Sequence, residues 1–181
     1  MPLRAQYACD WSPKSGYLRN KMPRPPLDRI DRRILEHLQA DGRLTNQDLA
    51  ARVALSPSPC LRRVRALEKA GVVRQYVALV DPLQVGLEML AYVTVKLEKK
   101  GRMPVEQFTR AVQSWPEVVA CYSMTGDMDY LMRVQVEDLD HYARFIMEKL
   151  LKQAGVIDIR SNFVLERIKD TTALPLEHLA G

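Results

Sequence analysis

The sequence predicts an α+β fold of two domains, an N-terminal helix-turn-helix domain followed by a C-terminal ferredoxin-like domain. Two patterns lead to this prediction. In the first half, apolar residues recur every three or four positions in three short runs that turn residues separate, which is typical of a helix-turn-helix. In the second half, strand-like and helix-like runs follow one another in the order β-α-β-β-α-β, which is the ferredoxin-like order.

The composition is that of an ordinary globular chain. Its 181 residues are enough for one domain or two small ones, and 47% of them are hydrophobic. No apolar run approaches the about 18–20 residues that span a bilayer, and no apolar stretch near the N-terminus is typical of a secretory signal. The three cysteines Cys9, Cys60 and Cys121 are odd in number and far apart, which is typical of reduced thiols. We therefore expect a cytoplasmic protein with no membrane partner.

The two ends of the chain lack a sustained pattern. Residues 1–26 show no helix-like or strand-like period and end in a proline-rich run, so we expect a disordered basic arm. Met22 directly precedes the patterned sequence and is a candidate true start, with the residues before it an upstream extension. At the other end we expect residues 171–181 to form a tail.

The helix-turn-helix domain is expected over residues 27–71. Its first helix has one apolar stripe, formed by Ile30, Ile34, Leu35 and Leu38, and Gly42 follows as a stop signal. Thr45 precedes Asp48 by three residues, which is an approximate capping box with the shorter carboxylate. A short second helix is therefore expected to begin there and to end near residue 54.

A third helix is expected to begin at Ser56-Pro57 and to end at Gly71. Ser56 is expected to accept a backbone N–H as N-cap, and proline at the first helical position loses a donor that has no partner there. Pro59 lies within the same first turn, although it opposes helical angles at Ser58. The expected buried face is formed by Cys60, Leu61, Val64 and Leu67.

Residues 72–88 are expected to form a strand and a hinge. The β-like run over 72–80 ends at Asp81-Pro82 and has no hairpin partner next to it in the sequence. Another segment must therefore cover its edge. Pairing with the same strand of a second subunit is one solution.

The ferredoxin-like domain is expected over residues 89–170. Its expected strands lie at 90–97, 118–124, 130–136 and 156–168, and its expected helices at 105–115 and 139–151. The two middle strands flank a tight turn, Gly126-Asp127-Met128-Asp129. Helices in this order cover only one face of the sheet, which leaves the other free to pair with a second subunit. We therefore expect a homodimer at least.

One face of the third helix is basic. Ser58, Arg62, Arg65 and Lys69 recur at i, i+4, i+7 and i+11, and Arg63 lies beside them. The net charge is +4 over residues 22–83 but −2 over residues 84–181. Arginine pairs with phosphates and reads guanine with two parallel hydrogen bonds. A solvated basic face without a ligand is the alternative, but the third helix of a helix-turn-helix favours double-stranded DNA as partner.

Four stretches of the chain are similar to those of one known family. They are residues 27–35 (LDRIDRRIL), 41–43 (DGR), 55–65 (LSPSPCLRRVR) and 125–130 (TGDMDY). In this order they resemble the Lrp/AsnC (feast/famine) family of bacterial and archaeal transcription regulators. The resemblance covers about residues 27 to 170 and leaves residues 1–26 without a counterpart.

The resemblance implies a winged helix-turn-helix that binds DNA and an effector domain that dimerises and binds amino acids. It further implies higher assemblies, such as a tetramer or octamer, and association with the bacterial nucleoid. The DNA-binding residues that it implies are Asn46, Gln47, Ser56, Pro57, Ser58, Pro59, Arg62, Arg63, Arg65 and Lys69. The effector-binding residues that it implies, in a cleft between subunits, are Met124, Thr125, Gly126, Asp127, Asp129 and Asn162.

The turn over residues 125–129 also has a chemistry of its own. A carboxylate such as that of Asp127 can hold an α-ammonium group, while N–H groups freed by glycine can hold an α-carboxylate. Taken alone, glycine and aspartate are more typical of an ordinary hairpin turn. The family context favours an effector site.

No catalytic residue, metal site or cofactor is expected. The three histidines lie in separate elements without ligand spacing, and Asp127 with Asp129 alone would make a poor cation cage. Cys60 is expected to be a small buried apolar residue, not a reactive thiol. The alternative is an enzyme, because certain sirohaem decarboxylases resemble the same family in both domains. The intact basic helix disfavours that alternative, and it equally disfavours a small-molecule-binding module without DNA binding.

Overall fold

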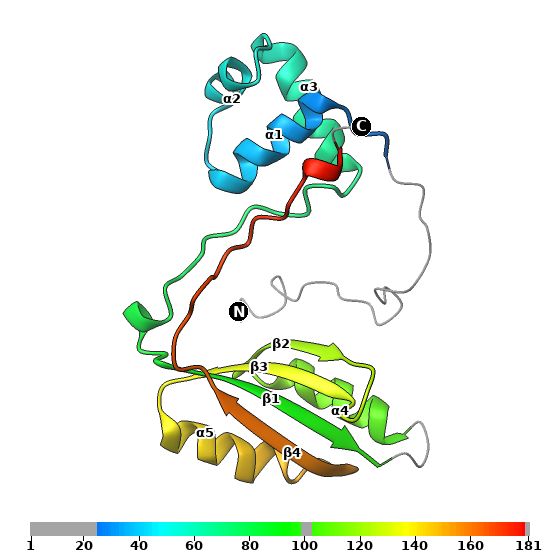
Figure 1. Cartoon of the computed structure of the whole chain (residues 1–181), viewed down its shortest axis with the longest axis vertical. Coiled ribbons are helices and arrows are strands. Elements are labelled where there is room, and N and C mark those ends of the chain that lie inside the picture. The colour runs from blue at the N-terminus through cyan, green and yellow to red at the C-terminus, as the bar shows by residue number, and fades with distance from the viewer. Residues whose placement is uncertain (1–24, 99–102, 180–181) are drawn as a thin grey trace, which may run out of the picture. The chain divides into compact units, whose positions relative to one another are not determined.

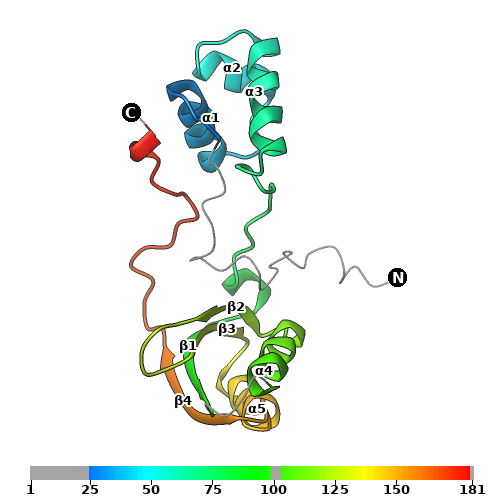
Figure 2. The same ribbon diagram turned by 90° about the vertical axis from the view of Figure 1, so that its right-hand side faces the viewer.

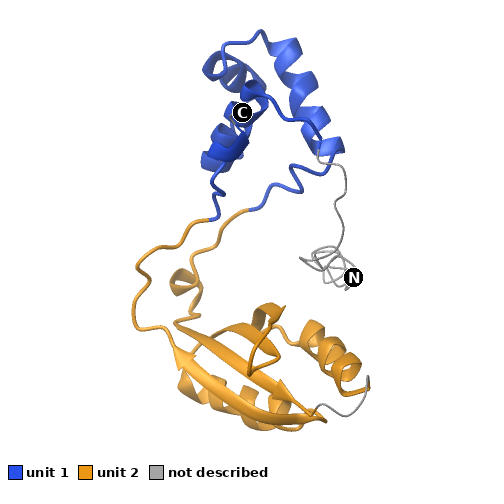
Figure 3. Ribbon diagram, turned by 45° about the vertical axis from the view of Figure 1, so that its right-hand side comes forward, with its two compact units in different colours: residues 1–77, 172–181 blue, residues 78–171 orange. Residues whose placement is uncertain are grey.

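The computed structural model describes residues 25–98 and 103–179, so the arm expected over residues 1–26 lies almost entirely outside the described residues. The chain divides into two compact units, residues 1–77 with 172–181 and residues 78–171 (Figure 3). None of the helices in the described ranges is long and apolar enough to cross a membrane.

The first unit contains the three predicted helices (Figure 1). They are α1 (Arg29–Ala40), α2 (Asn46–Arg52) and α3 (Pro57–Lys69). Their apolar faces meet in a small core formed by Ile34, Leu35, Leu49, Ala50, Val53, Cys60 and Leu67. The side chain of Cys60 is fully buried there, and burial raises the pKa of its thiol, as expected for a structural cysteine.

Side chains cap the first two helices. The Asp28 carboxylate accepts from the N–H groups of Ile30 and Asp31, each at 2.9 Å, and forms a capping box with Asp31. Thr45 caps α2, because its hydroxyl accepts from the Asp48 N–H at 3.1 Å, but the expected capping box is only half formed: the Asp48 carboxylate accepts from the Thr45 hydroxyl at 2.6 Å. These contacts fix where the two helices begin.

Two expectations for α3 are wrong. Ser56 occupies the N-cap position, but its side chain makes no capping hydrogen bond. The N-cap side chain normally bonds the N–H of the second or third helical residue, and here the third is Pro59, which has no N–H. Leu61 is 36% exposed instead of buried. The buried stripe runs through Cys60 and Leu67, and Leu61 lies about 100° around the helix from Cys60.

The strand expected over residues 72–80 does not form within the single chain, where this run contains no regular structure, and its pairing with a second subunit stays a prediction. Within the described chain no other strand pairs with it, so its backbone groups have no ladder to join. Leu79 is 74% exposed and Val80 is 66% exposed. Near residue 88 the linker is held to the second unit, because the Gln135 side-chain amide donates to the carbonyls of Leu87 and Met89.

The second unit has the predicted ferredoxin-like order. Its elements are β1 (Met89–Leu97), α4 (Met103–Ser114), β2 (Val118–Ser123), β3 (Tyr130–Val136), α5 (Leu139–Phe145) with its π-helical continuation η3 (Ile146–Leu150), and β4 (Val156–Phe163). The strands form one antiparallel sheet in the order β2-β3-β1-β4. Both helices cover the same face of this sheet, as Figure 2 shows. The other face is open, as predicted.

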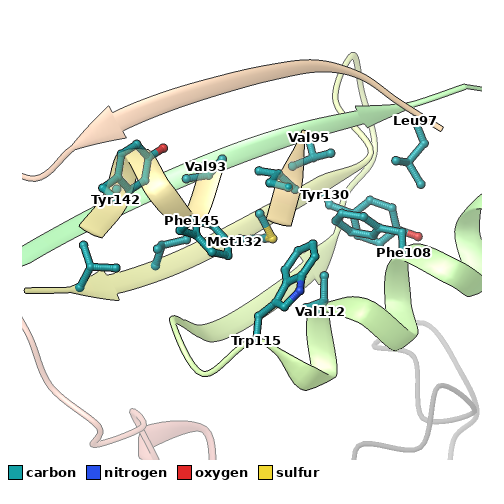
Figure 4. Close-up of a cluster of buried hydrophobic side chains, with 14 residues drawn as sticks. Val93, Val95, Leu97, Phe108, Val112, Trp115, Tyr130, Met132, Tyr142 and Phe145 are labelled. Carbon is teal, nitrogen blue, oxygen red and sulfur yellow. The ribbon is translucent and has the colours of Figure 1, made fainter. Parts of the chain in front are cut away.

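The core of the second unit lies between the helices and the covered face of the sheet (Figure 4). Trp115 packs edge-to-face against both Phe108 and Phe145. On the open face the register places Tyr92 of β1 opposite Arg133 of β3 and Asn162 of β4.

The last strand is shorter than predicted. It ends at Phe163 and not at residue 168. Its partner β1 begins at Met89, and the ladder closes where the Val164 N–H donates to the Leu90 carbonyl at 2.9 Å. Beyond that point the part of the chain that the structure describes offers no further strand for pairing, and Leu165 is 99% exposed.

The C-terminal tail packs within the first unit. The Gln39 side chain of α1 exchanges two hydrogen bonds with the Leu174 backbone, at 3.2 Å and 2.6 Å. Leu176 packs against the helical core, and a single 3-10 turn, η4 (Glu177–Leu179), follows. Residues 172–179 of the expected tail are thus a structural part of the helical unit.

Candidate functional sites

The exposed face of α3 is basic. Ser58, Arg62, Arg65 and Lys69 are all exposed, as their spacing predicts. In the part of the chain that the structure describes, no carboxylate forms an ion pair with any of the three cations. Their charge is therefore free to interact with a polyanion.

Arg63 does not join this exposed face. Its guanidinium Nη1 lies 2.8 Å from Asp28 Oδ2 and 2.8 Å from Asp31 Oδ1, at the start of α1. The backbone N–H of Asp31 and the guanidinium together hold the pKa of Asp28 below its ordinary value. Hydrogen bonds to the two carboxylates raise the pKa of Arg63 itself. Arg63 thus ties α3 to α1.

Asn46 has a similar connecting position. Its side-chain amide donates to the Pro57 carbonyl at 2.9 Å, which joins the start of α2 to the start of α3. Its Oδ1 atom is buried without a hydrogen-bond partner. The neighbouring Gln47 is exposed, as are Ser56 and Pro57. The structure therefore brings the start of α2 next to the first turn of α3, but it half-buries Asn46.

The turn between β2 and β3 has a defined backbone. Gly126 has φ +116°, a conformation that side chains disfavour. The Met124 N–H donates to the Asp129 carbonyl at 2.8 Å and closes the loop. Asp127 and Thr125 are exposed at its tip. The turn thus presents one carboxylate and a glycine backbone to solvent.

Asp129 is held by β1. Its N–H donates to the Val95 carbonyl at 3.0 Å, and its Oδ2 accepts from the Leu97 N–H at 2.8 Å. This carboxylate therefore fixes the turn to the sheet. Asn162, in contrast, does not lie beside the turn, because β4 pairs it with Tyr92. Tyr92 is at least three residues along β1 from the Asp129 contacts, which is about 10 Å at the rise of a strand.

One charged cluster in the second unit was not predicted from the sequence. Glu117 is buried, and its Oε1 accepts from the Lys149 ammonium and lies 3.6 Å from His141 Nε2. Although burial opposes ionisation, hydrogen bonds from Lys149 and the backbone keep the pKa of Glu117 below its ordinary value. No group of three metal-ligating side chains exists in the ranges 25–98 and 103–179.

Comparison with known proteins places both units in one family. A family model described as Lrp/AsnC ligand binding domain matches residues 90–174, and one described as winged helix-turn-helix DNA-binding matches residues 27–74. The leucine-responsive regulatory protein of Escherichia coli is 41% identical over 157 residues, which are 87% of this chain and 96% of that protein.

Solved structures agree. The L-Met complex of a transcriptional regulator from Neisseria meningitidis is 48% identical with a TM-score of 0.82, over 84% of this chain and 99% of that one. An AsnC family transcriptional regulator from Agrobacterium tumefaciens is 41% identical with a TM-score of 0.79, over the same shares. The resemblance inferred from the four short stretches is therefore confirmed. This chain belongs to the Lrp/AsnC family of transcriptional regulators.

Proposed function

We propose that this regulator binds double-stranded DNA through the exposed face of α3. The observation that carries the proposal is that Arg62, Arg65 and Lys69 form a basic face without ion-pair partners in the described chain, on the third helix of a helix-turn-helix. Such a helix enters the major groove, and free guanidinium groups can bind phosphates or guanine edges there. Ser58 shares this face.

The other predicted DNA-binding residues divide by their surroundings. Gln47, Ser56 and Pro57 are exposed near the start of α3, within reach of the same groove. Asn46, Pro59 and Arg63 are partly buried. We propose that Asn46 and Arg63 act by positioning α3, since both side chains bond to neighbouring helices.

Salt-dependent binding to a specific duplex tests this proposal. Arg62→Ala and Arg65→Ala should each weaken binding by about 1–3 kcal/mol if the side chain reads a base. If the side chain contacts only phosphate, the loss should be equal for all sequences and the salt slope should fall by about one. Arg110→Ala, an exposed arginine on α4, is the matched control and should change neither quantity. Full affinity in a folded Arg62→Ala/Arg65→Ala protein would refute the assignment.

We further propose that an amino acid is the effector and that the turn around Gly126 contacts it. Asp127 would face the ammonium group, backbone N–H groups would face the carboxylate, and Asp129 would hold the turn in place. The L-Met complex of the Neisseria relative supports an amino acid as the class of ligand. Since Asn162 lies away from the turn of its own chain, we propose that it contributes from a second subunit.

Titration calorimetry with the twenty amino acids tests the effector site. Asp127→Ala should abolish effector binding while leaving DNA binding without effector intact, because the residue lies in the other unit. Asp140→Ala removes another exposed carboxylate, on α5, and should have no effect. The proposal fails if no amino acid binds the wild type, or if Asp127→Ala binds as tightly.

Assembly is part of the same proposal. Tyr92 and Tyr122 are exposed on the open face of the sheet, which supports pairing with a second copy of the chain. We propose a homodimer that assembles to a tetramer or octamer, located with the DNA in the cytoplasm and acting without catalysis. Tyr92→Glu should shift the sedimentation coefficient towards the monomer, whereas Arg110→Glu on the helical side should not.

A further inference from the structure

One apolar side chain borders the basic face of α3. Leu61 is 36% exposed, whereas Cys60 next to it is fully buried. At about 100° per residue, Leu61 lies about 40° around the helix from Arg65 and about 60° from Val64. It therefore lies closer in direction to the exposed cation than to the buried stripe.

The position of Leu61 along the helix matters as well. It is the fifth residue of α3, which begins at Pro57, and it immediately precedes Arg62. In a helix-turn-helix, the N-terminal part of the recognition helix contacts base edges in the major groove. Leu61 thus belongs to the turns of α3 that approach the bases, whereas Lys69 at the far end does not.

The chemistry of the groove identifies what an apolar side chain can contact there. Most features of the base edges in the major groove are hydrogen-bond donors or acceptors, and the C5-methyl group of thymine is the apolar one. Where the cations around Leu61 contact phosphates, they position the helix without choosing a base, and an arginine that does read a base selects guanine. An apolar contact beside them adds selectivity for thymine, which a positive charge does not provide.

We propose that Leu61 contacts the C5-methyl group of a thymine and selects thymine at one position of each half of the DNA site. This inference rests on the proposed function, because it requires α3 to lie in the major groove. It assigns to the basic face one residue that discriminates between bases by an apolar contact.

Deoxyuridine gives a direct test, because it differs from thymidine only by the missing methyl group. A specific duplex is first selected in vitro with the full chain, and each thymine is then replaced in turn. Wild-type protein should lose about fourfold in affinity at one position of each half-site, which is the effect of removing one buried carbon from the contact. At the remaining thymines the loss should be absent.

The variant Leu61→Ala completes the cycle. It should bind the thymine duplex at least about fourfold more weakly than wild type, and it should be indifferent to deoxyuridine at the sensitive position. Arg62→Ala is the matched control: it should lose affinity but keep the wild-type sensitivity to deoxyuridine. Because Leu61 is not part of the helical core, Leu61→Ala should lower the melting temperature by only a few degrees.

Several outcomes would overturn the inference. The methyl contact is refuted if the wild type binds a specific duplex but no thymine in it is sensitive to deoxyuridine. The proposed function would stand in that case. The methyl contact is also refuted if Leu61→Ala remains as sensitive as wild type, or if its sedimentation changes, which would place Leu61 at a subunit contact. If the wild type shows no sequence preference for any duplex, the proposed function fails and the inference fails with it.

Discussion

Replacing Arg63 with alanine would separate the structural from the DNA-binding arginines of α3. In the structure its guanidinium is shared by Asp28 and Asp31, each at 2.8 Å. The Asp31 side chain is only 13% exposed, whereas that of Asp28 is 52% exposed. The change would therefore leave one partly buried carboxylate without its partner and would release α3 from the start of α1.

The expected cost follows from these exposures. A hydrogen bond to a charged group contributes about 1.5–3 kcal/mol, and an exposed ion pair about 0–1 kcal/mol. The contact with the partly buried Asp31 should therefore contribute close to 1.5–3 kcal/mol, and the contact with the exposed Asp28 about 0–1 kcal/mol. We expect Arg63→Ala to lower the free energy of unfolding of the helical unit by about 2 kcal/mol.

Native-state hydrogen exchange, read by peptide-level mass spectrometry, measures this loss in the helical unit alone. Exchange in peptides of α1 and α3 should accelerate by about thirtyfold, the equivalent of about 2 kcal/mol, and exchange in the second unit should not change. Arg62→Ala, one position away and exposed, should cost less than about 0.5 kcal/mol. In DNA binding the order reverses: Arg62→Ala should weaken binding more than folded Arg63→Ala does, because Arg63 acts on DNA only by positioning α3.

A double-mutant cycle tests whether Arg63 acts through Asp31. Asp31→Ala combined with Arg63→Ala should show a coupling energy of about 1–2 kcal/mol. The interpretation would be refuted if Arg63→Ala were as stable as Arg62→Ala, or if the coupling were zero. If Arg63→Ala lost DNA binding without losing stability, we would instead conclude that Arg63 contacts DNA directly.

Gly155→Ala should cost the second unit about 2–5 kcal/mol in urea unfolding, because the residue has φ +85° and the new Cβ would lie 2.7 Å from Pro104 Cβ. Gly86→Ala, at φ +75° with open space around it, should cost only about 1–2 kcal/mol. Because the pKa of Glu117 lies below the ordinary 4.5, the stability that its ionised form provides is complete above that pH and is lost as the pH falls through the lowered pKa. The melting temperature of Glu117→Gln should therefore fall less steeply than that of wild type between about pH 5 and pH 3. Gln39→Ala removes both hydrogen bonds to the tail, so hydrogen exchange over residues 172–179 should accelerate while the second unit is unchanged; equal exchange in the two proteins would contradict the observed packing.

Much of this fold could be predicted because its signals are local. The three helices of the first unit follow from apolar periods and capping residues, and the turn around Gly126 follows from glycine between two alternating runs. The sequence also contained a reason against the cap at Ser56, since Pro59 removes one of the two N–H groups that the cap could bond. The basic face of α3 needed only the helical spacing of its cations.

Other features depended on which surfaces the packing brought together. Arg63 looked like its arginine neighbours in sequence, and only the approach of α1, 35 and 32 residues earlier, assigned it to Asp28 and Asp31. The helical period of the sequence predicted that Leu61 is buried, but the packing of the helices buries Cys60 and Leu67 and leaves Leu61 36% exposed. The run over 72–80 has strand-forming residues but no partner in its own chain, because a strand needs a ladder that its own sequence cannot supply. Local sequence thus determined the helices of the first unit and the element order of the second, whereas the partners of Arg63 and the exposure of Leu61 were decided by contacts between segments far apart in the chain.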